Sequence, residues 1–338
     1  MCIFALPVIL LASLVVGADA ACTAPSAGDI IVDASGQHSN YRTIGEAVGK
    51  LNVETPEKQT IFIYAGTYSG RVVISNMMGP LVLQGYTCDT MSYSQNKVTI
   101  TYQMSQLTLP PYETGQDANE LASTLSINTD NVQVYNLNIV NTAVFTPKLG
   151  QAPALCVVCN TCAFYACNIS GHQDTLYAKK GHQLYARSLV AGTVDFIFGN
   201  ARAFFYMCDI ESVGKGYISA NGRATEEDDS YFVFNKARVF SSAPGKVYLG
   251  RPWKLYARAL FEFCDLSENI DPAGWTLMGK NKENSTDTRH FSLKEYKNTG
   301  LGSAIKDRVY YSGQLDNAVD MNTILGDDHD KFVNTAYL

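Results

Sequence analysis

A chain of 338 residues that is 46% hydrophobic can bury a large core, and all-β folds often use this much chain as one domain. Charged residues make up only 17%, whereas Gly, Tyr and Phe number 26, 20 and 15, a balance typical of a β-rich exported protein. The formal net charge of −6 argues against a nucleic-acid partner, because phosphate binding requires basic patches.

The beginning of the chain has the pattern of a secretory signal peptide. Residues 3–16 are mainly apolar, and Ala18, Asp19 and Ala20 follow as a small-residue cleavage pattern. The apolar stretch is short for a membrane anchor, and no second apolar segment of spanning length follows it. We therefore expect residues 1–20 to be removed and residues 21–338 to form a single, secreted extracellular domain that does not associate with a membrane.

Cysteine usage agrees with export. Nine cysteines less Cys2 in the signal segment leave eight, and an even number in an exported protein predicts disulfides. Cys156, Cys159 and Cys162 are spaced like metal ligands, but no matching His or second Cys-x-x-Cys pair completes a tetrahedral site. We expect disulfides or buried thiols rather than zinc, and the pairing stays open.

Strand-sized apolar runs, each followed by a polar turn, recur along the mature chain, for example at residues 59–64, 132–140, 163–169 and 203–210. Ile169, Val190 and Ile210 end comparable runs at steps of 21 and 20 residues. Such steps are typical of a parallel β-helix, whose coils place residues one period apart on the same face. An antiparallel sandwich is the alternative, but hairpin signals are nearly absent, Asn221-Gly222 being the exception. A short helix near residues 41–51 is expected to cap the N-terminal end.

Two aspartates, Asp174 and Asp195, lie 21 residues apart inside apolar, strand-like segments. If they occupy equivalent places on successive coils, they lie about one strand spacing apart, roughly 5 Å. Two carboxylates that close do not both ionise easily, so one can serve as an acid and the other as a base or nucleophile. Either aspartate alone could instead be a turn residue or part of a structural polar ladder.

Four segments in this order resemble the motifs of pectin methylesterases, which are built on a right-handed parallel β-helix. They are GQAPAL at 150–155, GHQDTLY at 171–177, GTVDFIFG at 192–199 and YLGRPW at 248–253. The resemblance, closer to fungal-type than to plant members, implies an all-β single-stranded solenoid. It also implies a monomeric carbohydrate esterase without metal or cofactor. The implied partner is methyl-esterified homogalacturonan, which the enzyme would convert to pectate and methanol.

The resemblance also implies a role for each catalytic position. Asp195 would attack the ester carbonyl, and Asp174 would protonate the departing methanol and then activate water against the acyl-enzyme. Gln151 and Gln173 would donate amide N–H groups to the developing oxyanion. Arg251 would pair with Asp195 and hold it ionised. The plainer alternatives are a stacked amide ladder for the two glutamines and a structural salt bridge for the arginine.

The residues expected to contact the substrate are Thr124, Gln151, Val194, Phe198, Arg251 and Trp253. His172 is expected to line the cleft, but a Ser-His triad has little support, because the chain contains no Gly-x-Ser-x-Gly elbow. Asn284 begins a glycosylation sequon in a polar loop, and Asn168 begins a weaker candidate at a strand end.

Two other functions remain open at this stage. A polygalacturonase or lyase on the same solenoid would also use two carboxylates roughly 5 Å apart, although the paired glutamines and the Gly-Arg-Pro-Trp segment favour ester chemistry. A pectin-binding protein without catalytic activity would keep the groove and lose the reaction.

Overall fold

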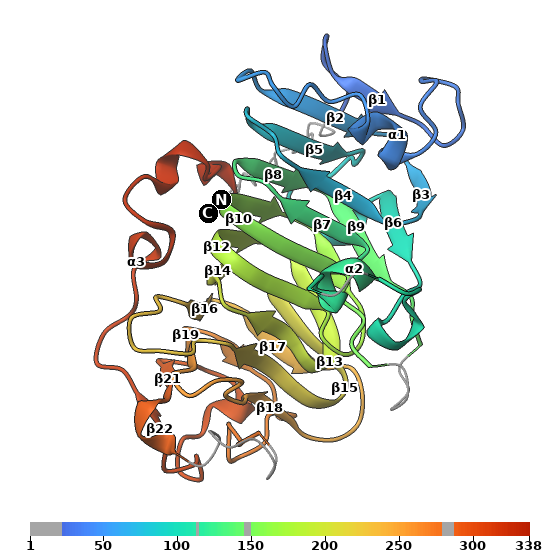
Figure 1. Ribbon diagram of the computed structural model, residues 1–338. Coiled ribbons are helices and arrows are strands. Elements are labelled where there is room, and N and C mark those ends of the chain that lie inside the picture. Colours follow the sequence, from blue (N-terminus) through green and yellow to red (C-terminus); the bar gives the residue numbers. More distant parts are fainter. Residues whose placement is uncertain (1–21, 113–114, 145–149, 279–286) are drawn as a thin grey trace, which may run out of the picture.

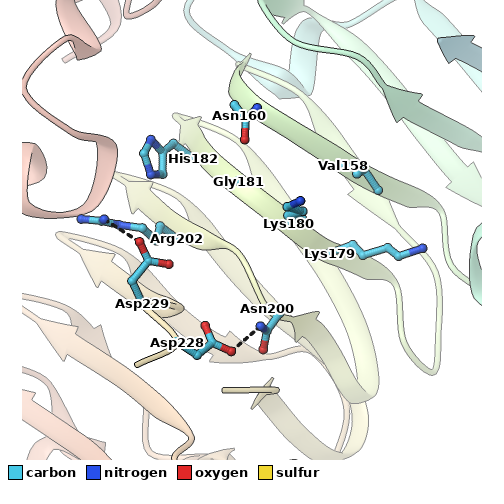
Figure 2. Close-up of a pocket in the computed structure, with 10 residues that line it drawn as sticks. All are labelled: Val158, Asn160, Lys179, Lys180, Gly181, His182, Asn200, Arg202, Asp228 and Asp229. Carbon is cyan, nitrogen blue, oxygen red and sulfur yellow. Dashed lines mark hydrogen bonds and ion pairs between the residues drawn. The ribbon is translucent and has the colours of Figure 1, made fainter. Parts of the chain in front are cut away.

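The computed structural model describes residues 22–112, 115–144, 150–278 and 287–338, and shows a parallel β-helix with few and short helices (Figure 1). The helices are α1 (Ile44–Val48), α2 (Ala118–Ala122) and α3 (Met321–Leu325). The strands are β1 (Ile30–Val32), β2 (Gln59–Ile63), β3 (Gly66–Ser69), β4 (Val72–Ser75), β5 (Leu81–Gly85), β6 (Val98–Tyr102), β7 (Leu125–Asn128), β8 (Val132–Tyr135), β9 (Leu137–Asn141), β10 (Leu155–Tyr165), β11 (Asn168–Ser170), β12 (Leu176–Ala186), β13 (Leu189–Gly199), β14 (Arg202–Tyr206), β15 (Asp209–Asn221), β16 (Tyr231–Asn235), β17 (Arg238–Ser241), β18 (Val247–Gly250), β19 (Arg258–Glu262), β20 (Asp265–Leu266), β21 (Ser292–Tyr296) and β22 (Ser312–Gln314).

Strands pair in parallel with the strands one coil before and one coil after them. Ile169 of β11 is the partner of Val190 in β13, and Val190 is the partner of Ile210 in β15. These are the residues whose spacing indicated the period in the sequence. The predicted parallel β-helix is therefore confirmed, together with the stacking of its central coils.

A column of aromatic rings runs through the inside of the solenoid. Phe164, Tyr185, Phe205, Phe234 and Phe261 come from five successive coils and are partners in the strand register. Their ring planes are nearly parallel, with successive centroids 4.9, 4.7, 4.6 and 4.2 Å apart. Because each ring fits between two others, a slip of one coil by one residue would remove its ring from the column and turn it outward.

One corner of the solenoid repeats an uncommon backbone conformation. At this corner Asn136, Ala166, Arg187, Met207, Lys236, Phe263 and Lys297 all have positive φ. Non-glycine residues rarely adopt it, yet here the N–H of Ala166 donates to the carbonyl of Ala186, and that of Arg187 to the carbonyl of Tyr206. The hydrogen bonds between coils thus continue around the corner and offset the backbone strain.

The cysteines are divided between disulfides and buried thiols. Cys22 is bonded to Cys88 and Cys159 to Cys162, so the latter pair is not available as metal ligands. The remaining described cysteines, Cys156, Cys167, Cys208 and Cys264, are free and buried. Both outcomes left open by the sequence therefore occur.

The N-terminal end and one side of the solenoid are covered. The predicted N-terminal helix is α1, which begins after the capping residue Thr43 and buries Ile44 and Ala47 against the first strands. At the other end the chain returns along the side of the solenoid, and α3 lies beside β12 and β14 (Figure 1). This segment buries Phe332 and Tyr337 against outward-facing side chains of the coils.

Several expectations fall outside or at the edge of what the structure describes. Residues 1–20 and Asn284 lie outside the described residues. Asn168 is half-buried in β11, and its Oδ1 accepts a hydrogen bond from the Ser170 hydroxyl. Within the described part of the chain, every helix is too short or too polar to cross a membrane.

A buried carboxyl group anchors the returning C-terminal segment and predicts a pH effect. Glu262 is fully buried and accepts hydrogen bonds from Val319 N (2.9 Å) and Asn235 Nδ2 (2.6 Å). Burial raises the pKa of Glu262 although both hydrogen bonds lower it, so folding favours its protonated form. The contribution of Glu262 to stability is present below the pKa that its carboxyl group has in the unfolded chain, and it is lost as pH rises through the pKa of the folded state.

We expect Glu262→Gln to have a lower free energy of unfolding than wild type, and we expect this deficit to be smaller at pH 7 than at pH 4. Thermal unfolding of both proteins across this range tests it, and a constant difference would contradict it.

Candidate active site

Asp174 and Asp195 lie next to each other on adjacent coils, as the 21-residue spacing predicts. The N–H of Asp174 donates to the carbonyl of Val194 over 2.9 Å. Two residues further along, Leu176 of β12 is the partner of Ile197 in β13. Both aspartates are only 8% exposed, so their carboxyl groups sit in a confined, weakly hydrated space.

Both aspartates also have positive φ, 62° at Asp174 and 49° at Asp195. This conformation costs an L-residue on the order of 1 kcal/mol, although Asp tolerates it better than most. It interrupts the alternation of β13: Phe196 and Ile197 belong to the inner core, whereas Phe198 lies on the outer face. The backbone irregularity therefore gives an acidic side chain a place outside the core within an apolar strand.

Arg251 pairs with Asp195 through two parallel hydrogen bonds. Its Nε lies 2.8 Å from Oδ1 and its Nη2 lies 2.7 Å from Oδ2. Burial alone would lower the pKa of Arg251, but the bonds to Asp195 and its charge raise that pKa above its ordinary value. Gly250, the residue before Arg251, allows β18 to lie close to β15, because a Cβ at this position would lie 2.1 Å from Ser219 Oγ. Such a bidentate pair fixes the orientation of the carboxylate as well as its distance from the guanidinium.

A cavity of about 210 Å³ opens over the two aspartates. It is lined by Asn119, Gln151, Gln173, Asp174, Asp195, Phe198, Ala220, Arg251, Trp253 and Met278. The structure thus brings together the five residues expected to be catalytic and the two aromatic residues expected to contact the substrate.

The two glutamines are held by the backbone of neighbouring turns. Gln106 N donates to the carbonyl of Gln151 over 2.9 Å, and Ala152 N donates to the carbonyl of Gln173 over 3.1 Å. Since these contacts use main-chain atoms, both side-chain amides can face the cavity that they line. Amide N–H groups close to two carboxyl groups are suited to stabilise an oxyanion.

One wall of the cavity is apolar. Tyr177 and Phe198 stack with ring centroids 4.3 Å apart. Trp253 meets Phe198 edge to face, and their ring centroids are 6.0 Å apart. Ala220 and Met278 belong to the same cluster. Such a wall fits an uncharged group or the flat face of a sugar better than a free carboxylate.

Two of the expected substrate contacts lie elsewhere. Thr124 is fully buried, and its hydroxyl donates to the carbonyl of Val140 over 3.1 Å, so the structure does not support a substrate contact for it. Val194 is half-buried and lines a neighbouring hollow with Tyr217 and Tyr248. His172 is not among the described residues that line the cavity, and burial lowers its pKa.

Asn119 lines the cavity although no motif in the sequence indicates it. It lies on α2, and Gln106 Nε2 donates to its Oδ1 over 2.7 Å, which leaves its amide N–H groups for the cavity. Lys179 holds α2 on the sheet, with its Nζ 2.8 Å from Asp117 Oδ2 and 3.1 Å from Glu120 Oε2. The sequence gives no signal of these contacts, because Lys179 follows α2 by some 60 residues.

The position of α2 leads to a prediction for Lys179→Met. Without the cation, the two acidic side chains repel each other and Asn119 loses its fixed position at the cavity. We expect KM for polymeric substrate to rise about fivefold, the effect of roughly 1 kcal/mol of partly buried pairing, with little change in kcat. Lys179→Arg, which keeps the charge, is the matched control. An unchanged KM in Lys179→Met would contradict the role given to α2.

Comparison with known proteins places this chain in a family. The Pectinesterase family model matches residues 29–324. Pectinesterases of Aspergillus aculeatus and Aspergillus niger are 40% and 38% identical, covering 93% and 94% of this chain and 93% of each relative. The crystal structure of the deglycosylated Aspergillus niger pectin methylesterase superposes with a TM-score of 0.83 at 33% identity, covering 93% of this chain and 99% of that one. The carrot enzyme follows with a TM-score of 0.74 at 26% identity, over 87% of this chain and 91% of that one. The family model, the relatives and the solved structures agree with one another, and the chain belongs to the pectinesterase family.

Proposed function

We propose that the chain hydrolyses the methyl esters of homogalacturonan, with Asp195 as nucleophile and Asp174 as general acid and base. The observation that carries this assignment is the arrangement of the two carboxyl groups. They come from adjacent coils into one cavity, where Arg251 holds Asp195 through two parallel hydrogen bonds. A bidentate arginine orients the Asp195 carboxylate as the attacking group, and the neighbouring Asp174 is assigned the proton transfers.

The first half of the reaction forms an acyl-enzyme. An oxygen of Asp195 attacks the ester carbonyl carbon, and the carbonyl oxygen becomes an oxyanion that Gln151 and Gln173 stabilise through their amide N–H groups. The intermediate collapses with cleavage of the bond to the methoxy group, which takes the proton of Asp174 and leaves as methanol. The product of this half is an anhydride between Asp195 and galacturonate.

The second half releases the acid. Asp174, now ionised, removes a proton from water, and the hydroxide attacks the galacturonyl carbon of the anhydride. Cleavage of the anhydride returns Asp195 as a carboxylate and leaves a galacturonate carboxyl group in the polymer. Acid, base and nucleophile all come from the chain itself, so the cycle closes without a cofactor.

Substrate contacts are assigned on the same basis. Phe198 and Trp253 lie on the apolar wall, where a methyl ester loses little on desolvation and the acidic product is disfavoured. Gln151 and Arg251 line the cavity from the polar side. Val194, in the adjoining hollow, is retained as a contact for a flanking sugar.

Secretion, a single domain over residues 21–338 and a monomeric state belong to the same proposal. Two disulfides among the described residues support an oxidising destination, because such bonds are rare in the cytosol. Expression of the whole chain in a secreting host, with mass measurement of the exported protein, tests the cleavage site and the oligomeric state together.

The function is tested by measuring which bond of highly methylated pectin is broken. We expect methanol to be released without new reducing ends and without unsaturated uronides. New reducing ends would indicate a polygalacturonase, and ultraviolet-absorbing products a lyase. Retention on a pectin column without any methanol would indicate a binding protein.

A further inference from the structure

The guanidinium of Arg251 contacts two side chains. One is the carboxylate of Asp195, and the other is an aromatic ring that does not belong to the acidic pair. Asp195 binds one edge of the group through Nε and Nη2. The ring of Tyr217 covers one face, with Arg251 Cζ only 3.9 Å from the ring centroid. A cation over an aromatic face is attracted electrostatically, and the planar guanidinium also stacks on the ring.

The fold brings Tyr217 to this place through close strand contact. Tyr217 lies on β15 and is the strand partner of Val194, the residue before Asp195. Gly216 permits the approach, because a Cβ there would lie 2.1 Å from the carbonyl oxygen of Thr193. On the next coil Tyr248 stacks against Tyr217 with centroids 5.7 Å apart and planes 25° from parallel. The Tyr217 ring therefore packs against a second ring as well as against Arg251.

The ring supplies a constraint that the hydrogen bonds lack. Two parallel hydrogen bonds align the edges of the guanidinium and the carboxylate, but the arginine side chain can still tilt out of the carboxylate plane. A flat surface against one face removes that freedom and keeps water from that side of the pair. The side chains of Arg251 and Asp195 are accordingly only 18% and 11% exposed.

We propose that Tyr217 is a positioning residue of the esterase: its ring keeps Arg251 in plane with Asp195, and thereby keeps the attacking carboxylate aimed at the substrate. The inference rests on the proposed function of Asp195 and adds a residue to it. Tyr217 lines the adjoining hollow with Val194 and not the cavity over the acidic pair, so we assign its effect on the reaction to Arg251 rather than to contact with the reacting atoms.

The test compares variants that remove the ring with variants that keep it. For Tyr217→Leu we expect kcat to fall about 10-fold, which corresponds to roughly 1.4 kcal/mol of transition-state stabilisation, with KM nearly unchanged. Tyr217→Phe and Tyr217→Trp keep an aromatic face and should stay within about twofold of the wild-type kcat. In an Arg251→Lys background, where the planar group is gone, Tyr217→Leu should cost little more.

The chain contains a matched control for the loss of an arginine–tyrosine stack. Arg258 Cζ lies 3.9 Å from the ring centroid of Tyr231, in a side-chain cluster that does not line the cavity. Tyr231→Leu removes that stack from the ring side and Arg258→Met removes it from the cation side, so one of them serves if the other folds poorly. We expect both to lower the melting temperature and leave kcat of the folded protein unchanged.

Three outcomes would overturn the inference. A raised KM with unchanged kcat in Tyr217→Leu would make the ring a sugar-stacking surface. A lower melting temperature with unchanged kcat would make it structural. A kcat loss in Tyr217→Phe equal to that in Tyr217→Leu would assign the effect to the hydroxyl. If the activity of Arg251→Lys is too low to measure, the comparison of kcat between Tyr217→Leu and the variants Tyr217→Phe and Tyr217→Trp decides. Wild type that releases no methanol would instead refute the proposed function itself.

Discussion

Replacing Asp195 with Asn is expected to lower kcat for methanol release by about 10⁴-fold or more, the scale seen when a covalent nucleophile is lost. An amide oxygen is a poor nucleophile and cannot form the anhydride. The substitution also leaves Arg251 without its charged partner. Since Asn keeps the size of the side chain and can still accept a hydrogen bond from Arg251, the fold should be retained.

Single-turnover methanol release measures this effect directly, and two controls protect it. Asp195→Ala distinguishes true residual activity from Asn that has reverted to Asp by deamidation, because Ala cannot revert. Binding of methylated oligogalacturonate should persist in both variants, since the apolar wall of Phe198 and Trp253 remains. Methanol release at more than a hundredth of the wild-type rate in Asp195→Ala would remove Asp195 from the nucleophile role.

Replacing Asp174 with Asn is expected to lower kcat by about 10²- to 10⁴-fold, the range attributed to general acid and base catalysis. The amide cannot give a proton to the methoxy group or take one from water. Asp195 keeps its partner Arg251 in this variant, so attack on the ester remains available. The loss of kcat should therefore depend on whether the leaving alcohol must be protonated as it departs.

Leaving-group dependence separates the roles of the two aspartates. Trifluoroethyl esters of oligogalacturonate leave without protonation, so Asp174→Asn should form the acyl-enzyme much faster from them than from methyl esters. Asp195→Asn should gain nothing from the same change. A burst of released alcohol followed by slow turnover is expected in Asp174→Asn, because hydrolysis of the anhydride still lacks its base. An equal increase in the rate of acyl-enzyme formation in both variants would show that the assignment of Asp174 as general acid is wrong.

The candidate site was predictable to the extent that it follows the coil period and short motifs. Asp174 and Asp195 are one coil apart in the sequence, so their proximity follows from strand stacking. Gln151 and Gln173 are likewise one coil apart, and Gln173 directly precedes Asp174. Arg251 follows Asp195 by 56 residues and was identified through the resemblance of its Gly-Arg-Pro-Trp segment, not through any local period.

The residues that were missed depend on the docking of side chains from different coils. Asn119 reaches the cavity because Lys179 and Gln106 hold α2 on the outer face. Thr124, only five positions later, is fully buried. Tyr217 lies under Arg251 because two coils approach closely at Gly216. A helix of five residues and a single glycine inside strand β15 carry too little periodicity to indicate these contacts.

The amino-acid sequence by itself determined the fold class, the length of the central coils, the two acidic residues and the family. These follow from the repetition of strand-sized runs and from short motifs, which are local properties of the chain. Only the tertiary structure decided which cysteines pair, which residue of the 117–124 segment faces the cavity and what lies against Arg251. Those outcomes depend on backbone turns such as the positive φ at Asp195, because a turn redirects a side chain while leaving the residue pattern around it unchanged.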